Sequence, residues 1–346
     1  MSNGSSNNTV VVTGGAGFIG SHTVVELIGA GYEPIIVDDF SNSQRSVLEG
    51  LEAILGRKIP CHAIDCNDTD ALRFVFESEG PIKGVIHFAA FKAVGDSVAR
   101  PLAYYRNNVG SLITLMEVMQ QFEVRDLVFS SSCTVYGQPD TLPVTEETPC
   151  KPATSPYGHT KQICESIIED AVRAELPLRT AVLRYFNPIG AHSSSRIGEL
   201  PLGTPENLAP VITQAAAGIR DQITVYGNDY ETPDGTNIRD YIHVVDLALA
   251  HVKSLQWLDS QDTAPMSEIF NLGVGSGSSV LEVIAAFESA SGMSLQYRVG
   301  DRRAGDIEKI YANVDKAERM LHWKAERSME EAMRDAWNWQ LALARE

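Results

Sequence analysis

The stretch Thr9-Val-Val-Val-Thr-Gly-Gly-Ala-Gly-Phe-Ile-Gly20 decides the fold. Its opening β-branched run is too short for a helix and ends at glycines, which predicts a buried parallel strand. A helix-like segment, 21–30, follows. Gly14, Gly17 and Gly20 therefore lie between a strand and a helix, where they permit a tight turn and close approach of the backbone to a pyrophosphate. The N-terminus of the helix then offers free N–H groups to the phosphates.

Beyond this stretch, strand-like and helix-like segments alternate along the chain. Further strands are expected at 34–37, near 61–64, and at 84–90, 126–132 and 180–187. Helices are expected between them, notably at 102–121 and 157–175. The alternation predicts βαβ crossovers and an α/β fold with a doubly wound parallel sheet, the Rossmann fold.

The texture of the sequence changes after residue 187. The segment 191–207 is rich in Ser, Gly and Pro and predicts a long loop, with helical pieces at 208–219, 244–257, 281–291 and 329–343. We expect residues 1–8 to form a flexible leader, 9–187 a dinucleotide-binding domain and 188–346 a smaller α/β substrate lobe. Segments near 240–265 are candidates for packing back on the first domain.

The second expected strand ends in Asp38, which indicates the type of dinucleotide. A carboxylate at a strand end about 20 residues after the glycines accepts hydrogen bonds from ribose hydroxyls and repels a 2′-phosphate. No Arg follows Asp38 at once. The sequence therefore predicts NAD rather than NADP.

Composition and charge narrow the function further. A formal net charge of −17 argues against nucleic acid or an anionic membrane as partner. The sequence contains no apolar run of membrane-spanning length, and residues 1–8 lack the apolar segment of a signal peptide. Five cysteines without C-x-x-C spacing predict reduced thiols and a cytoplasmic protein. The His residues show no metal-ligand spacing, so we expect no metal site.

Tyr157 and Lys161 are the first catalytic candidates. On a helix, positions i and i+4 share one face, and a neighbouring cation lowers the pKa of a phenol. Ser132 ends the fifth expected strand, at the sheet edge where ligands bind, and its hydroxyl can relay a proton to the phenol. Each residue alone also fits an ordinary structural role: a helix cap, an amphipathic core edge or a solvated helix face. The order of Gly-rich turn, acidic strand end, Ser and Tyr-x-x-x-Lys favours a redox site.

These motifs resemble a known family. Thr13-Gly-Gly-x-Gly-Phe-Ile-Gly20, Ser130-Ser-Ser-Cys-Thr-Val-Tyr-Gly137 and Ser155-Pro-Tyr-Gly-x-x-Lys161 resemble the extended short-chain dehydrogenase/reductase superfamily. Leu183-Arg-Tyr-Phe-Asn-Pro-Ile-Gly-Ala-His192 and Asp234-Gly-Thr-x-x-Arg-Asp-Tyr-Ile-His-Val-x-Asp246 are similar to the UDP-glucose 4-epimerase family within it. The resemblance runs from Val10 to about Trp339, nearly the whole chain.

The resemblance implies a reaction and a set of contacts. UDP-glucose and UDP-galactose would interconvert by transient oxidation at sugar C4, with tightly bound NAD, Tyr157 as base and acid, and Lys161 and Ser132 assisting. Implied cofactor contacts are Gly14, Gly17, Phe18, Ile19, Gly20, Asp38, Asn42, Ser43, Asp65, Cys66, Phe88, Ala89, Ala90, Lys92, Asn107, Ser130, Tyr157, Lys161, Tyr185 and Pro188. Implied UDP-hexose contacts are Ser132, Tyr157, Asn187, Asn207, Leu208, Val225, Tyr226, Arg239, Tyr241, Arg303, Asp306 and Ile310.

Two of the implied phosphate contacts have an alternative interpretation. Arg239 could instead pair with its neighbour Asp240, and Arg303 could pair with Asp301 or Asp306. The run from Ser132 to Thr134 holds no carboxylate, whereas related dehydratases and decarboxylases carry an additional acid there, so dehydration is not expected.

Several functional alternatives remain open at this point. In the family that the chain resembles, the residue before a final Tyr/Trp-Ala pair acts as a gate: a small residue admits an N-acetyl group and a large aromatic one excludes it. The resemblance places Ile310 at this gate, before Tyr311-Ala312. Its intermediate size predicts UDP-glucose and UDP-galactose as the main pair, with poor turnover of N-acetylhexosamines. Epimerisation of UDP-GlcNAc/GalNAc or of UDP-uronate is the alternative, and a non-catalytic dinucleotide-sensing protein is a more distant one. The family also implies a homodimer through the helices at 102–121 and 157–175.

Overall fold

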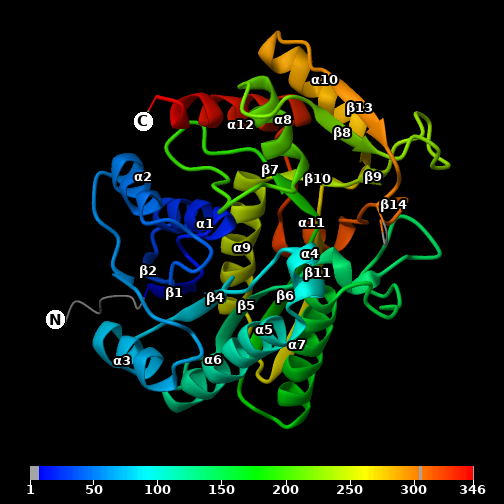
Figure 1. Cartoon of the computed structure of the whole chain (residues 1–346). Helices are drawn as coiled ribbons and strands as arrows, with labels where there is room; N and C mark the ends of the chain where they lie inside the picture. The colour runs from blue at the N-terminus through cyan, green and yellow to red at the C-terminus, as the bar shows by residue number, and fades with distance from the viewer. Residues whose placement is uncertain (1–7, 304–305, 346) are drawn as a thin grey trace.

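The computed structural model describes residues 8–303 and 306–345, and a parallel sheet of seven strands forms its centre (Figure 1). The strand order is β11-β6-β5-β4-β1-β2-β3, and every pairing is parallel. The strands are β1 (Thr9–Thr13), β2 (Glu33–Val37), β3 (Cys61–His62), β4 (Gly84–His87), β5 (Asp126–Ser130), β6 (Arg179–Tyr185) and β11 (Met266–Leu272). The predicted doubly wound sheet is confirmed.

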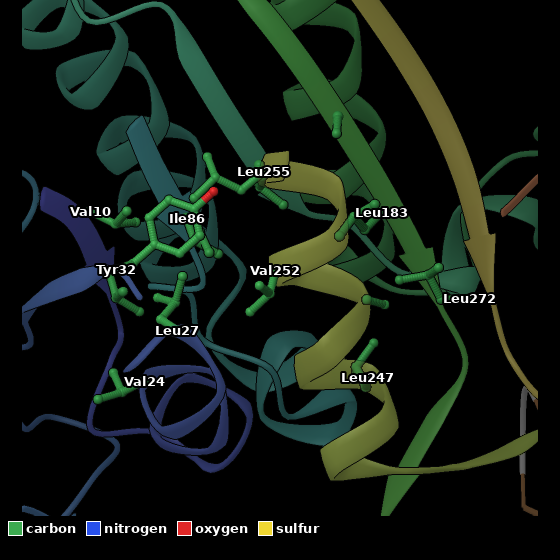
Figure 2. Packing of buried hydrophobic residues seen from close by; sticks show 14 of the residues in the cluster. Val10, Val24, Leu27, Tyr32, Ile86, Leu183, Leu247, Val252, Leu255 and Leu272 are labelled. Carbon is green, nitrogen blue, oxygen red and sulfur yellow. The ribbon is translucent and has the colours of Figure 1, made fainter. Parts of the chain in front are cut away.

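Helices cover both faces of this sheet. They are α1 (Phe18–Gly29), α2 (Ser46–Leu55), α3 (Thr69–Glu79), α6 (Gly110–Gln121), α7 (Pro156–Arg173) and α9 (Val244–Asp259). Successive side chains of a strand point to opposite faces: Val10 and Val12 of β1 enter the core under α1 and α9, and Val11 enters the core under α3, α6 and α7. Figure 2 shows the first of these cores, in which Leu27 of α1 lies with Val252 and Leu255 of α9. Two buried faces explain why the strands are apolar runs rather than alternating ones.

The chain returns to the sheet after residue 187. Helix α9 packs against α1, and β11 pairs with β6 along its whole length at the edge of the sheet. Strand β11 was not predicted from the sequence. It belongs to the central sheet although it lies beyond the expected 187/188 division. The position of the boundary between the dinucleotide-binding domain and the smaller lobe stays a prediction. Residues 1–7 of the expected leader lie outside the described residues.

A smaller α/β lobe stands on one end of the sheet (Figure 1). Helices α8 (Leu208–Ala216), α10 (Val280–Ser291) and α12 (Met329–Leu343) pack together there around Ile212, Phe287 and Met333. Short strands join them: β7 (Asn187–Ile189), β8 (Ile223–Tyr226), β9 (Ile238–Arg239), β10 (Tyr241–His243), β12 (Ser278–Ser279), β13 (Tyr297–Gly300) and β14 (Lys309–Ile310). Helix α11 (Asp315–Leu321) packs against α9.

The expected helix at 102–121 is interrupted in the structure. It consists of α5 (Pro101–Tyr104), a π-helical segment (Tyr105–Val109) and α6, preceded by the short α4 (Val94–Ala99). The buried Asn108 lies in the π-helical segment, where its side chain binds the backbone of Phe91 and the Thr160 hydroxyl. None of the helices in the described part of the chain has the length and apolar character needed to cross a membrane.

Candidate active site

A cavity of about 1160 Å³ opens at the carboxyl ends of the strands, lined both by the sheet domain and by the smaller lobe. Pockets for a single small ligand measure roughly 300–1,000 Å³, so this cavity has room for more than one. Open parallel sheets bind their ligands at this edge.

The Gly-rich turn forms one wall of the cavity. Gly14 has a φ of +69°, and a Cβ there would lie 2.8 Å from the Ala89 backbone nitrogen, so a side chain would close this approach. Gly17 precedes α1, and no side chain caps the amides of the first turn. These N–H groups are therefore free to bind an anion. The bare cradle fits a dinucleotide phosphate.

Asp38 lies directly after β2 and is tied to the Gly-rich turn. Its carboxylate accepts hydrogen bonds from the Ala16 amide (3.0 Å), the Phe40 amide (2.9 Å) and the Ser43 hydroxyl (2.8 Å). Burial raises the pKa of this carboxyl, and the three donors oppose the rise. The fixed acceptor beside the phosphate cradle fits the ribose of NAD.

The proposed reacting groups gather at the ends of β5 and β6. Lys161 is 4% exposed and donates from Nζ to the Ser130 carbonyl at 2.6 Å. The Ser130 hydroxyl and the Tyr185 hydroxyl are 2.6 Å apart. Both line the cavity with Tyr157. Three hydroxyls and one ammonium group can therefore exchange protons with a bound sugar.

The pKa shifts of Tyr157 and Lys161 differ from the expectation that Lys161 lowers the pKa of the phenol. Burial raises the pKa of Tyr157, Tyr185 adds to the rise, and hydrogen bonding with Ser132 opposes it. Burial also lowers the pKa of Lys161 to about 8. The expected lowering of the phenol pKa by Lys161 is wrong for the protein alone, because the phenol is desolvated and Lys161 donates to a carbonyl instead. Tyr157 is thus protonated at rest.

Ser132 and Ile310 do not line the cavity. The Ser132 hydroxyl caps the short 3₁₀ helix Cys133–Tyr136 by accepting from the Thr134 amide at 3.3 Å. Ile310 is 2% exposed in β14, where it packs in a core that includes Tyr136 and Phe186. Ile310 is therefore not positioned as a gate on the cavity wall.

The arginines expected to bind phosphate line the cavity. Arg239 lies 3.5 Å from Asp306, whereas Asp240 accepts from the backbone amides of Val274, Gly275 and Ala312. The alternative Arg239–Asp240 pair is therefore not formed. The Arg303 guanidinium stacks on the Tyr226 ring at 3.9 Å.

The structure brings the other candidates together as well. Every implied cofactor contact lines the cavity, from Gly14 to Pro188. The implied UDP-hexose contacts that line it are Tyr157, Asn187, Asn207, Leu208, Val225, Tyr226, Arg239, Tyr241, Arg303 and Asp306. Their individual roles stay predictions. In the described ranges 8–303 and 306–345, no cluster of three or more His, Cys, Asp or Glu could hold a metal.

Sequence reasoning missed Glu199. Its carboxylate lines the cavity, accepts from the Asn207 amide at 2.6 Å and lies 3.4 Å from Lys92 Nζ. The Trp339 indole donates to its backbone carbonyl at 2.9 Å. Glu199 lies in the irregular segment 191–207, where no periodicity or motif marks it, so only the tertiary structure reveals the bridge.

The chain is similar to known proteins over nearly its whole length. A family model described as GDP-mannose 4,6 dehydratase matches residues 11–336. UDP-glucose 4-epimerase 2 of Arabidopsis thaliana is 50% identical over 96% of this chain and 94% of its own length. The UDP-glucose 4-epimerase of Bacillus subtilis (strain 168) is 50% identical over 96% of each chain.

Solved structures give the same picture. A crystal structure of UDP-glucose 4-epimerase from Stenotrophomonas maltophila, with bound NAD and formylated UDP-arabinopyranose, has a TM-score of 0.94 and 46% identity over 97% of this chain and 99% of that one. The enzyme of the same name from Bifidobacterium longum, in complex with NAD⁺ and UDP, has a TM-score of 0.91 and 47% identity over 96% and 98%.

Proposed function

The chain belongs to the UDP-glucose 4-epimerase family, and we propose that it interconverts UDP-glucose and UDP-galactose by transient oxidation at sugar C4, with NAD as a tightly held cofactor. The observation that carries this proposal is one cavity that contains both a phosphate cradle at Gly14 and the hydroxyl cluster around Tyr157. A net isomerisation needs both, because the hydride must leave and return within one closed site.

One set of residues would bind NAD, and another would take part in the reaction at C4. The Gly14–Gly20 turn and the α1 N-terminus would hold the NAD phosphates, and Asp38 the ribose. Bound NAD would supply a reversible hydride acceptor for C4 and a positive charge that favours the phenolate form of Tyr157. Tyr157 would take the O4 proton and give it back, with Ser132 supporting the phenol. Lys161, fixed on the Ser130 carbonyl, supplies a second positive charge.

The nucleotide half of the substrate would be bound by the smaller lobe. Arg239 and Arg303 would pair with the diphosphate, and the side-chain amides of Asn187 and Asn207 would donate to it. Uracil and its ribose would lie against Leu208, Val225, Tyr226, Tyr241 and Asp306. These contacts would hold the nucleotide and leave the hexose free to present either face of C4.

Elimination of water is not supported by the site. The turn after β5 presents Ser132, Cys133 and Thr134 and no carboxylate. A dehydratase needs an additional acid at such a position to remove a hydroxyl. Although the family model carries a dehydratase description, the chemistry present fits epimerisation better.

We keep UDP-glucose and UDP-galactose as the main pair, with poor turnover of N-acetylhexosamines. The buried position of Ile310 removes the specific argument from that side chain, so the preference stays a prediction. Comparable kcat/KM values for UDP-GlcNAc and UDP-glucose would refute it.

We also propose a homodimer and a cytoplasmic location. Leu102 and Val98 are 79% and 63% exposed, and Ile113 of α6 is 41% exposed. These side chains favour burial against a second copy of the chain. The acidic chain is a poor partner for nucleic acid or an anionic membrane. The five cysteines are free, as a reducing compartment would keep them.

The decisive experiment supplies UDP-galactose without added NAD and follows UDP-glucose. The wild-type protein should convert it with the NAD that it carries. Tyr157→Phe keeps the buried ring, and should lose roughly 10²–10⁴-fold in kcat while retaining NAD. A fully active variant would refute the proposed role of Tyr157. A wild-type protein with neither NAD nor conversion would instead favour a non-catalytic dinucleotide sensor.

A further inference from the structure

A buried ion pair lies behind the proposed reacting groups. Arg184 of β6 donates to Glu165 of α7, from Nη2 at 2.6 Å and from Nε at 3.0 Å. Their side chains are 5% and 12% exposed. The Ser131 hydroxyl donates to the same carboxylate. Glu165 thus receives hydrogen bonds from two separate strands, β6 and the end of β5.

Each member of this cluster is a neighbour of a proposed reacting group. Ser131 stands between Ser130 and Ser132, and Arg184 directly precedes Tyr185. Glu165 follows Lys161 by one helical turn, on the same face of α7. Because strand side chains alternate, Ser131 and Arg184 point away from the face that carries Ser130 and Tyr185.

The far side of Arg184 is also fixed. Its guanidinium lies 4.9 Å from the centroid of the Tyr136 ring, and Nη1 donates to the Glu146 carbonyl at 3.4 Å. The Tyr136 hydroxyl in turn donates to Asn271 of β11 at 2.6 Å. These contacts restrain Arg184 on the side away from the carboxylate, and Glu165 is held between Arg184 and Ser131.

Stability alone is a weak reason for this pair. Removing two charges from water costs as much as their attraction returns, and apolar replacements of a buried pair are often neutral or stabilising. Such pairs are better explained when they fix a unique geometry. The geometry fixed here is that of the β5 end, whose Ser130 carbonyl holds Lys161.

We propose that Glu165 is a positioning residue for the epimerase reaction: by holding Ser131 against Arg184, it fixes the Ser130–Ser132 strand end on which Lys161, Tyr185 and Tyr157 depend. The proposal rests on the proposed function. Without the carboxylate, the strand end could shift. A misplacement of about 1 Å at a reacting centre can cost roughly 10²-fold in rate.

The effect should appear in kcat rather than in substrate binding. Glu165→Gln should lower kcat for UDP-galactose by roughly 10–100-fold, change its KM less than about threefold, and leave NAD bound. The matched control is Glu169→Gln, one turn further along α7. Glu169 forms an exposed pair with Arg173, with side chains 64% and 63% exposed, so kcat and KM should both stay at the wild-type values.

Two further variants separate positioning from stability, since Glu165→Gln leaves Arg184 without its counter-charge and could unfold the protein. Ser131→Ala keeps the ion pair and should lower kcat about tenfold with KM unchanged, while the protein stays folded. Glu165→Met combined with Arg184→Met removes both charges, and should keep the protein folded with kcat still low.

The outcomes are distinct. Wild-type kcat in Ser131→Ala, or in the folded double variant, would overturn the proposal and leave the pair a purely structural one. A rise in KM matching the fall in kcat would overturn it as well, because the substrate site would then be what changed. Failure of the underlying function would appear differently, as a wild-type protein that converts no UDP-galactose.

Discussion

Replacing Lys161 by Met tests two separate effects of this lysine: its contribution to epimerase activity, and the loss of folding free energy caused by burying its charge. Lys161 is 4% exposed, and burial lowers its pKa from 10.5 to about 8. Met has a similar length and no charge. We therefore expect Lys161→Met to abolish activity without destabilising the protein at neutral pH.

The magnitude follows from the pKa. A fall from 10.5 to about 8 corresponds to about 3 kcal/mol, at roughly 1.4 kcal/mol for each tenfold change in proton affinity. Against this, Met gives up the hydrogen bond to the Ser130 carbonyl, which is worth roughly 1–3 kcal/mol when one group is charged. The variant should therefore be more stable than the wild type by about 0–2 kcal/mol at pH 7.

The pH dependence gives a sharper test. The buried lysine disfavours its charged form, so its cost to folding is complete below pH 8, where both states hold the proton. Between about pH 8 and 10.5 the folded protein releases that proton and the unfolded chain keeps it. The stability of the wild type therefore rises across this window relative to the variant, and the advantage of Lys161→Met shrinks by up to about 3 kcal/mol.

The assay is urea unfolding of both proteins, stripped of bound nucleotide, from pH 7 to 10.5. Lys253→Met, at an exposed position of α9, serves as control and should show no such window. Epimerase activity of Lys161→Met should fall by roughly 10²-fold or more. A variant that is destabilised by more than about 1 kcal/mol at pH 7, or whose advantage grows with pH, would refute the reasoning.

Three further predictions concern other parts of the molecule. Glu199→Ala should raise the KM for UDP-glucose about tenfold. The Asn207 side-chain amide, which we expect to donate to the diphosphate, would lose the hydrogen bond to Glu199 that fixes its position, and that bond is worth roughly 1.5 kcal/mol. Glu199→Gln keeps an acceptor for the Asn207 amide and should raise KM less than Glu199→Ala does. Equal KM values for the two variants in steady-state assays would exclude this role of Glu199. Arg239→Met should weaken UDP binding by roughly 10–100-fold in calorimetry with NAD content unchanged, and undiminished affinity would remove Arg239 from the diphosphate site. Leu102→Glu should yield monomers in analytical ultracentrifugation, and persistent dimers would place the interface elsewhere.

The sequence was informative about the fold where structure is locally determined. The β-branched run before Gly14 and the alternation of segments up to residue 187 were sufficient to predict the doubly wound sheet. Strand β11 was missed because its first four residues are only half-buried, as expected of an edge strand that pairs with β6 alone. Its sequence therefore lacks the continuous apolar run that marks the inner strands.

The site was predictable as far as motifs reach. Spacing and resemblance identified Tyr157, Lys161 and Asp38, which the structure places along one cavity. Spacing and resemblance could not show that Lys161 binds the Ser130 carbonyl. They also could not show that burial outweighs the charge of Lys161 in setting the pKa of the Tyr157 phenol. Both effects depend on packing between distant segments. The same holds for the contact of Glu199 with Lys92, which lies 107 residues away in the sequence.

The acidity of the chain limits how it can hold an anion. The formal charge is −17, and the cavity wall itself carries seven carboxylates against five cationic side chains. Charges beyond about 8 Å are largely screened at physiological salt, so attraction must come from groups in contact with the ligand. Arg239, Arg303 and the free amides at the start of α1 and α8 line this cavity or open onto it, and we expect them to make these contacts. The reactive end presents hydroxyls, with a lysine already tied to a carbonyl. A site arranged in this way would bind its substrate through the phosphates and make few charged contacts with the hexose, which is what a reaction on both faces of C4 requires.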